Sequence, residues 1–230
     1  MKRILLLRHG STEANERFLY CGRSDISLTD KGKNYLQSRA LSYQKKLNSD
    51  EKENSVNVKY FTSGMKRTDE TLEILFDTRI YERLTDFKEM DFGIYEMKSY
   101  DELKDRPDYR EWISGDFYSN IPVGGESGNQ MKKRVLRAFD KLTAKLGDEP
   151  ENTVYVLVCH GGVIAAIMEY LFVNEDRNLY EWQPKQGCGA LSHWLSSLSS
   201  PPSVFLSYFI AFFVSRLQIV SALCAAASVR

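Results

Sequence analysis

Short, continuous apolar runs alternate along the chain with longer stretches in which apolar residues recur every three or four positions. The runs at 3–7 and 153–158 are typical of strands that are buried on both faces of a parallel sheet, and 58–62 predicts a third, short strand. The longer stretches have the spacing of amphipathic helices, and Thr29 has a side-chain oxygen that can cap the first of them. The pattern predicts helices in four places: 29–47, 66–76, 131–147 and 163–172.

Strands that alternate with helices are typical of an α/β fold. We therefore expect a three-layer α/β/α sandwich around a mostly parallel central sheet. Residues 94–125 contain prolines and several aromatic side chains, and they predict a helical and looped insertion near the functional site. The aromatic rings can line a substrate site, or they can simply pack the insertion onto the core.

The last part of the chain differs in composition from the rest. Residues 188–230 contain two arginines and no aspartate or glutamate, and 204–214 is almost wholly apolar. Arg216 ends that run short of the roughly 20 residues that span a bilayer. We expect a folded domain at 1–196 and an atypical tail at 197–230. Three interpretations of the tail stay open: a membrane-seeking segment, a core helix, or a poorly folding segment of abnormal origin, such as a shifted reading frame.

Charge and cysteine content limit the class of protein. The chain has 31 Lys and Arg and 31 Asp and Glu residues, so its formal net charge is zero and no global field favours nucleic acid as a partner. Its four cysteines form no CxxC pair, so we expect no metal site, and reduced thiols in a cytoplasmic protein. The apolar run near the N-terminus is too short for a signal peptide. Apart from the tail, nothing in the sequence indicates binding to a membrane. The oligomeric state is not predicted from the sequence.

Two of the three histidines follow predicted strands in matching contexts. LLLRHGS and VLVCHGG each place a histidine and a glycine just after a buried run. Because the carboxyl ends of parallel strands meet at one edge of a sheet, we expect His9 and His160 to share one crevice. Arg8 and Arg67 add two guanidinium groups near strand ends, which suits bidentate binding of phosphate. Gly161 would let the backbone at the start of a helix approach an anion closely.

These residues resemble the signature segments of the histidine phosphatase superfamily, which has the phosphoglycerate-mutase-like fold. The similar segments come in the family's order within 1–190: RHG with Thr12 and Asn15, GRSD and LTDKG between 22 and 32, S-x-x-x-R-x-x-x-T at 63–71, EMDFG at 89–93, GGES at 124–127 and CHGG at 159–162. The EMDFG segment and the short interval between Glu89 and His160 resemble the small bacterial phosphatases of the family, which include α-ribazole phosphatase. Met97 departs from the family, which often has glycine there. The family usually ends with a strand soon after the helix of its second histidine, and the resemblance implies that strand at 189–195.

The resemblance implies a metal-independent phosphomonoesterase that needs no cofactor and acts on a small phosphorylated metabolite, such as α-ribazole 5′-phosphate. His9 would attack phosphorus and form a phosphohistidine, and Glu89 would protonate the leaving group and then activate water. Three residues would stabilise the charge of the phosphoryl group: Arg8, Arg67 and His160. Three more would contact phosphate or substrate: Asn15, Arg23 and Gly161.

Other functions stay open at this point. A phosphoglycerate mutase-type enzyme would form the same phosphohistidine but return the phosphoryl group to a second hydroxyl instead of to water. A catalytically silent protein would bind a phosphate ester tightly and form no phosphoryl enzyme. A membrane-tethered interaction protein is indicated by the tail alone.

Overall fold

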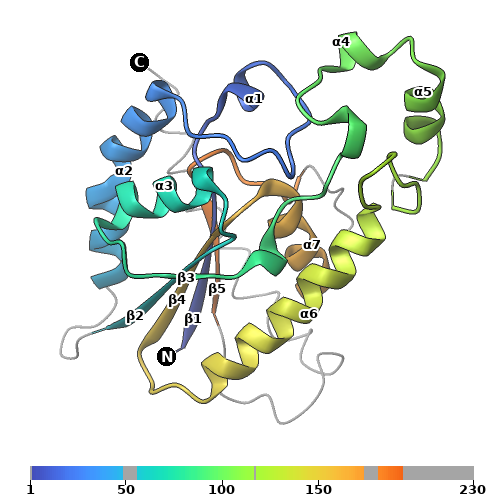
Figure 1. Ribbon diagram of the computed structural model, residues 1–230. Coiled ribbons are helices and arrows are strands. Elements are labelled where there is room, and N and C mark those ends of the chain that lie inside the picture. The colour runs from blue at the N-terminus through green and yellow to red at the C-terminus, as the bar shows by residue number, and fades with distance from the viewer. Residues whose placement is uncertain (1, 49–55, 117, 174–180, 194–230) are drawn as a thin grey trace.

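The computed structural model describes residues 2–48, 56–116, 118–173 and 181–193, and these build one five-stranded sheet with helices on both faces (Figure 1). The strand order is β3-β2-β4-β1-β5. The first four strands of that order are parallel, and β5 runs antiparallel to β1 at one edge. The strands have these bounds: β1 Arg3–Arg8, β2 Asn57–Thr62, β3 Glu82–Arg83, β4 Thr153–Cys159 and β5 Gly189–His193.

Helices form the two outer layers. Figure 1 shows α2 and α3 on one side of the sheet and α6 and α7 on the other, with α1, α4 and α5 beyond the carboxyl ends of the strands. The helices have these bounds: α1 Glu13–Glu16, α2 Asp30–Asn48, α3 Lys66–Phe76, α4 Tyr100–Leu103, α5 Pro107–Ser114, α6 Gly128–Gly147 and α7 Gly161–Leu171. Two short 3-10 helices, Thr85–Phe87 and Gly93–Tyr95, lie between β3 and α4. This is the three-layer α/β/α arrangement that the sequence predicted.

The alternation of side chains along each strand divides the core into two parts. Ile4 and Leu6 of β1 pack in the cluster that includes the buried faces of α6 and α7. Leu5 and Leu7 pack in the cluster that includes α2 and α3. Since neighbouring residues of a strand point to opposite faces, one continuous apolar run serves both layers. That is why β1 carries no polar alternation.

The predicted elements agree with the structure to within a few residues. The Thr29 hydroxyl accepts a hydrogen bond from the Gly32 N–H at 3.1 Å, so it caps α2 as expected. The sequence pattern did not predict β3, because its two residues are exposed and carry no apolar signal. It also missed α1, a single turn whose capping box is its main local determinant. The tail at 197–230 and the end of the predicted strand at 189–195 lie outside the described residues.

The segment 94–125 forms the second 3-10 helix, α4, α5 and connecting loops. Three of its rings are buried, and they meet edge to face or tilted at 5–6 Å between centroids: Tyr95, Tyr109 and Trp112. Tyr20 joins this group through a hydrogen bond from one phenol to the other, at 2.7 Å from the Tyr109 oxygen. These three rings therefore pack the insertion onto the core, as the second of the two interpretations expects, whereas the Tyr100 side chain of the same segment is exposed.

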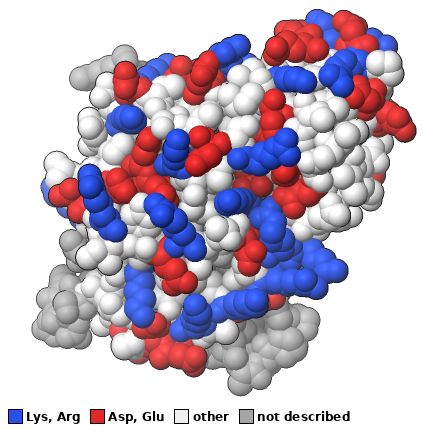
Figure 2. Space-filling model, in the orientation of Figure 1, with Lys and Arg blue, Asp and Glu red and all other residues white. Residues whose placement is uncertain are grey.

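Acidic and basic side chains are mixed over the face that Figure 2 shows. This agrees with the zero net charge of the chain, and any site for an anion must depend on a local cluster of cations. None of the helices in the described part of the chain is long and apolar enough to cross a membrane.

Candidate active site

The structure brings His9 and His160 together at the carboxyl ends of β1 and β4. These strands are adjacent, and Arg8 of β1 lies opposite Cys159 of β4, so the next residue of each strand leaves the sheet at the same level. The centroids of the two imidazole rings are 5.2 Å apart. Exposed fractions are 6% for His9 and 0% for His160. The predicted convergence of the two histidines at one edge of the sheet is thus present.

A backbone carbonyl fixes the tautomer of His9. Its Nδ1 lies 2.7 Å from the Gly10 carbonyl oxygen, which can only accept, so Nδ1 carries the proton. In a neutral ring this leaves the lone pair on Nε2. The Thr71 hydroxyl holds Gly10 in place. It accepts from the Gly10 N–H at 2.9 Å and donates to the Arg67 carbonyl. Thr71 thus connects the backbone at His9 to α3.

A chain of hydroxyl groups fixes the tautomer of His160. The Thr68 hydroxyl donates to the Met65 carbonyl at 2.7 Å, and it lies 3.1 Å from the Ser63 oxygen. The Ser63 hydroxyl then donates to Thr68 and accepts from Nε2–H of His160 at 2.8 Å. Nδ1 of His160 is buried, and the described residues offer it no hydrogen-bond partner. It therefore presents a lone pair inside the site.

Two guanidinium groups lie near the imidazoles: that of Arg67 is buried, and that of Arg8 is partly buried. Arg67, on the first turn of α3, is 1% exposed, and it donates to the Ser24 carbonyl at 2.7 Å and to the Gly22 carbonyl at 2.8 Å. Arg8 donates to the Pro184 carbonyl at 3.0 Å. The Nε atoms of both arginines are buried without a hydrogen-bond partner among the described residues. Unsatisfied buried donors on cationic side chains are typical of a site that receives an anion.

Glu89 is held at the start of α7. Its Oε2 accepts from the Gly162 N–H at 3.0 Å. A Cβ atom at Gly162 would lie 2.5 Å from Oε1 of Glu89, and one at Gly161 would lie 3.0 Å from the Arg8 guanidinium carbon. Because Gly161 and Gly162 have no side chain, the Arg8 guanidinium and the Glu89 carboxylate can lie close to the backbone at the start of α7. The sequence predicted that this helix end would meet a ligand anion, whereas in the structure the Gly162 N–H meets Glu89.

Arg134 on α6 supports the segment that carries Glu89, and sequence reasoning did not identify it. Its Nη1 donates to the carbonyl oxygens of Asp86 and Lys88 at 2.7 and 3.0 Å, and its Nη2 donates to the Glu126 carboxylate. Five donors on one planar group suit this task. No local signal marks Arg134, because the carbonyl groups that it binds are more than 40 residues away. Ser63 and Thr71 could have been found, since they are the first and last positions of the S-x-x-x-R-x-x-x-T segment.

Asn15 and Arg23 lie outside the buried group. The Asn15 side-chain oxygen accepts from the backbone N–H and the hydroxyl of Thr12, both at 3.0 Å, as part of the α1 capping box. Arg23 has a 55% exposed side chain, which lies 3.5 Å from the Asp91 carboxylate and donates to the Gly124 carbonyl at 3.3 Å. Any contact of Asn15 with a ligand would have to come from its amide NH2 group.

Burial and the neighbouring cations keep both histidines neutral. The pKa of His9 lies well below 6.5, because of burial and then because of the positive charges of Arg67 and Arg8. The pKa of His160 is lowered for the same reasons, with burial the largest cause. Burial also raises the pKa of the Cys159 thiol, so this cysteine stays a packed, protonated side chain. An uncharged imidazole keeps the lone pair that nucleophilic attack requires.

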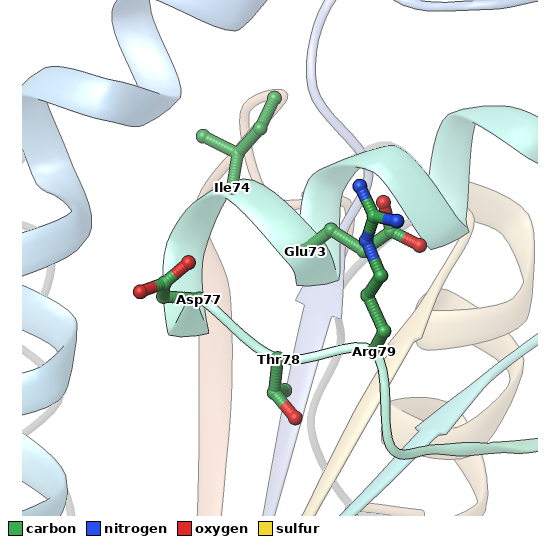
Figure 3. Close-up of a pocket in the computed structure, with 5 residues that line it drawn as sticks. All are labelled: Glu73, Ile74, Asp77, Thr78 and Arg79. Atoms are coloured by element: carbon green, nitrogen blue, oxygen red, sulfur yellow. The ribbon is translucent and has the colours of Figure 1, made fainter.

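A separate pocket lies at the other end of α3. Figure 3 shows its five lining residues, which are at the last turn of the helix and in the loop after it: Glu73, Ile74, Asp77, Thr78 and Arg79. None of them is a candidate site residue, and Arg67 is at the opposite end of the helix. In the part of the chain that the structure describes, no group of three or more His, Cys, Asp or Glu side chains is placed to hold a metal ion.

Comparisons with known proteins agree with this geometry. The family model of the histidine phosphatase superfamily (branch 1) matches residues 4–192. The adenosylcobalamin/alpha-ribazole phosphatase of Salmonella typhimurium is 27% identical over 190 residues, which cover 81% of this chain and 87% of that protein. Phosphoglycerate mutase-like protein 4 of Arabidopsis thaliana is 31% identical over 177 residues, which cover 72% and 69% of the two chains.

A solved structure shares the fold. The putative alpha-ribazole-5'-P phosphatase of Escherichia coli aligns with a TM-score of 0.66 at 24% identity, over 83% of this chain and 89% of that one. The match of the family model covers both histidines, both arginines and Glu89. We conclude that the chain belongs to branch 1 of the histidine phosphatase superfamily and is a phosphatase of that family.

Proposed function

We propose that the chain is a metal-independent phosphomonoesterase that acts through a phosphohistidine at His9 on a small phosphorylated metabolite. One observation carries this proposal. His9 is neutral and buried, its Nδ1 proton is committed to Gly10, and its ring lies 5.2 Å from that of His160. The Nε2 lone pair is therefore the nucleophile, in a site that already contains two guanidinium groups.

In the first step, Nε2 of His9 attacks phosphorus while the bond from phosphorus to the leaving oxygen breaks. The electrons of that bond go to the leaving oxygen, and Glu89 gives it a proton. Arg8 and Arg67 stabilise the charge on the phosphoryl oxygens. His160 can contact one of those oxygens through Nδ1 only when Nδ1 carries a proton, which a monoanionic substrate can supply.

In the second step, water attacks the phosphohistidine. Glu89, now a carboxylate, removes a proton from the water as the bond between phosphorus and nitrogen breaks. The products are inorganic phosphate and the free imidazole of His9, so both residues return to their starting states. Asn15 stabilises the loop after His9 through its bonds to Thr12, and Arg23 and Gly161 are assigned to contact with substrate as part of this proposal.

The first substrate to test is α-ribazole 5′-phosphate. Two of the relatives described above are named as α-ribazole phosphatases. The EMDFG segment and the short interval between Glu89 and His160 also resemble the small bacterial phosphatases of the family. A panel of phosphate monoesters, assayed in the presence of a chelator, would rank this ester against others. A rate for it no higher than for unrelated esters would contradict this choice of substrate.

Trapping of the phosphoryl enzyme tests the proposed reaction. Wild-type protein quenched during turnover of a 32P-labelled ester should carry label that is stable in base and lost in acid, as a phosphohistidine is. His9→Ala should lose both turnover and label. Glu102→Gln, a change in a surface capping carboxylate that lies in α4, is the control and should keep both. Label that persists in His9→Ala would require a different nucleophile.

A phosphoglycerate mutase-type reaction is the second candidate. It is favoured by the similarity to Arabidopsis phosphoglycerate mutase-like protein 4. Both reactions share the phosphohistidine and differ in whether water or a second hydroxyl receives the phosphoryl group. Release of inorganic phosphate, measured beside the isomerisation of 3- to 2-phosphoglycerate, separates them. Tight binding of a phosphate ester with neither product would instead indicate a catalytically silent protein.

A further inference from the structure

The Glu96 carboxylate accepts hydrogen bonds from the backbone of a distant loop, residues 22–24. Glu96 directly follows the 3-10 helix Gly93–Tyr95, and its Oε1 accepts from the N–H groups of Gly22 at 2.9 Å and Arg23 at 3.0 Å. Its Oε2 accepts from the N–H and the hydroxyl of Ser24 at 3.1 and 2.7 Å. Three successive backbone N–H groups thus converge on one internal anion, in the concave arrangement that binds anions elsewhere.

The opposite side of this loop holds Arg67. The carbonyl oxygens of Gly22 and Ser24 accept from Nη2 and Nη1 of Arg67 at 2.8 and 2.7 Å. The N–H groups of the loop therefore face Glu96 while two of its carbonyl groups face the guanidinium. Both carbonyl groups that Arg67 binds therefore belong to a loop whose N–H groups are hydrogen-bonded to Glu96 on the opposite side.

The loop has little room to move. A Cβ atom at Gly22 would lie 1.7 Å from the Met90 carbonyl oxygen, so the loop backbone rests directly on the segment that follows Glu89. Glu96 also accepts from the Phe92 N–H at 3.0 Å, which fixes its carboxylate to that same segment. The Arg23 side chain also binds neighbouring backbone, but it is exposed, and its bonds to the Gly124 and Gly93 carbonyl oxygens are longer, at 3.3 and 3.4 Å.

We propose that Glu96 is a positioning residue that sets the orientation of the Arg67 guanidinium through the loop at 22–24, and so sets the affinity of the site for a phosphoryl group. This inference rests on the proposed function, since it takes the site of Arg67 to be the phosphoryl site. Glu96 itself does not touch substrate. Glu96 acts on Arg67 through the backbone of residues 22–24, because the N–H groups of this loop bind Glu96 and its carbonyl groups bind Arg67.

Glu96→Gln tests the proposal with little change in size. The amide keeps one oxygen, but its NH2 group faces backbone N–H donors, so the loop must shift away. The dissociation constant for inorganic phosphate, measured by calorimetry, should rise about tenfold, as for the weakening of one charged hydrogen bond. In an Arg67→Ala background, the same substitution should raise it less than about twofold, because the group that Glu96 positions is gone.

The control is Glu102→Gln. The Glu102 carboxylate also accepts from the backbone N–H and the hydroxyl of one serine, Ser99, both at 2.8 Å, but it caps α4. This variant should bind phosphate as the wild type does. A thermal unfolding curve for each variant reports whether it is folded. If Glu96→Gln does not fold, Ser24→Ala, which removes only the hydroxyl bond to Glu96, takes its place, with an expected rise of about threefold.

Two results would overturn the inference. One is an unchanged phosphate affinity in the folded variant. The other is an equal loss of affinity with and without the Arg67 side chain, which would show that Glu96 acts on the site by another route. Calorimetry does not depend on turnover. A wild-type protein that binds phosphate but forms no phosphohistidine would contradict the proposed function, while the comparison of variants would still decide the role of Glu96.

Discussion

The close approach of Glu89 to the start of α7 predicts a specific effect of Gly162→Ala. The added Cβ would lie 2.5 Å from Oε1 of Glu89, whereas ordinary contacts are at least 3.4 Å, so the carboxylate must move by roughly 1 Å. The atom that yields is the end of a flexible side chain, and Gly162 has no positive φ, so the fold should tolerate the change. The substitution thus displaces the proposed acid without removing it.

A displacement of about 1 Å in a catalytic group can lower a rate by about 100-fold. We expect a loss of this order in kcat for an alkyl phosphate, whose leaving oxygen needs a proton. We expect much less for p-nitrophenyl phosphate, whose leaving group needs little protonation. The control is Gly147→Ala, at the end of α6, where a Cβ would meet no atom within 4 Å.

Steady-state kinetics on both esters, with the midpoint of thermal unfolding as a check on folding, measures this effect. Gly147→Ala should leave both rates unchanged. If Gly162→Ala slowed both esters equally, Glu89 would not act as the proton donor. If it slowed neither, the position of the carboxylate at the helix start would have no part in catalysis.

Two further predictions concern stability. Phe18 has φ of 54° and an 86% exposed side chain, so Phe18→Gly should raise the free energy of unfolding by about 0.5–1 kcal/mol, while Phe18→Ala should not; an equal gain for both in urea denaturation would contradict this account of backbone strain. The lowered pKa values of His9 and His160 mean that, below pH 6.5, the unfolded chain takes up protons that the folded protein resists. Stability should therefore be complete above that pH and fall by up to about 1.4 kcal/mol per pH unit for each histidine on going towards about pH 5. His160→Asn should remove about half of that slope, and an unchanged slope would contradict burial of a neutral ring.

The sequence by itself predicted the layers of the fold. All side chains of the run at 4–7 are apolar. A short run of this kind predicts a strand in the interior of a sheet that is covered on both faces. The helical spacing after each strand then predicts the crossovers, and parallel strands bring their carboxyl ends to one edge. His9 and His160 follow two such strands, which is why the order of residues along the chain is enough to predict their meeting.

Only the tertiary structure decided how the candidate site is supported. By its local sequence Arg67 is an exposed residue on a helix turn, yet it is buried, because carbonyl groups more than 40 residues away in the chain satisfy its donors. Glu96 and Arg134 carry no local signal for the same reason, since the backbone groups that they bind in distant loops are 45 to 74 residues away. Hydrophobic periodicity is a property of neighbours along the chain, whereas the hydrogen bonds of buried polar groups depend on which loops the completed fold brings together.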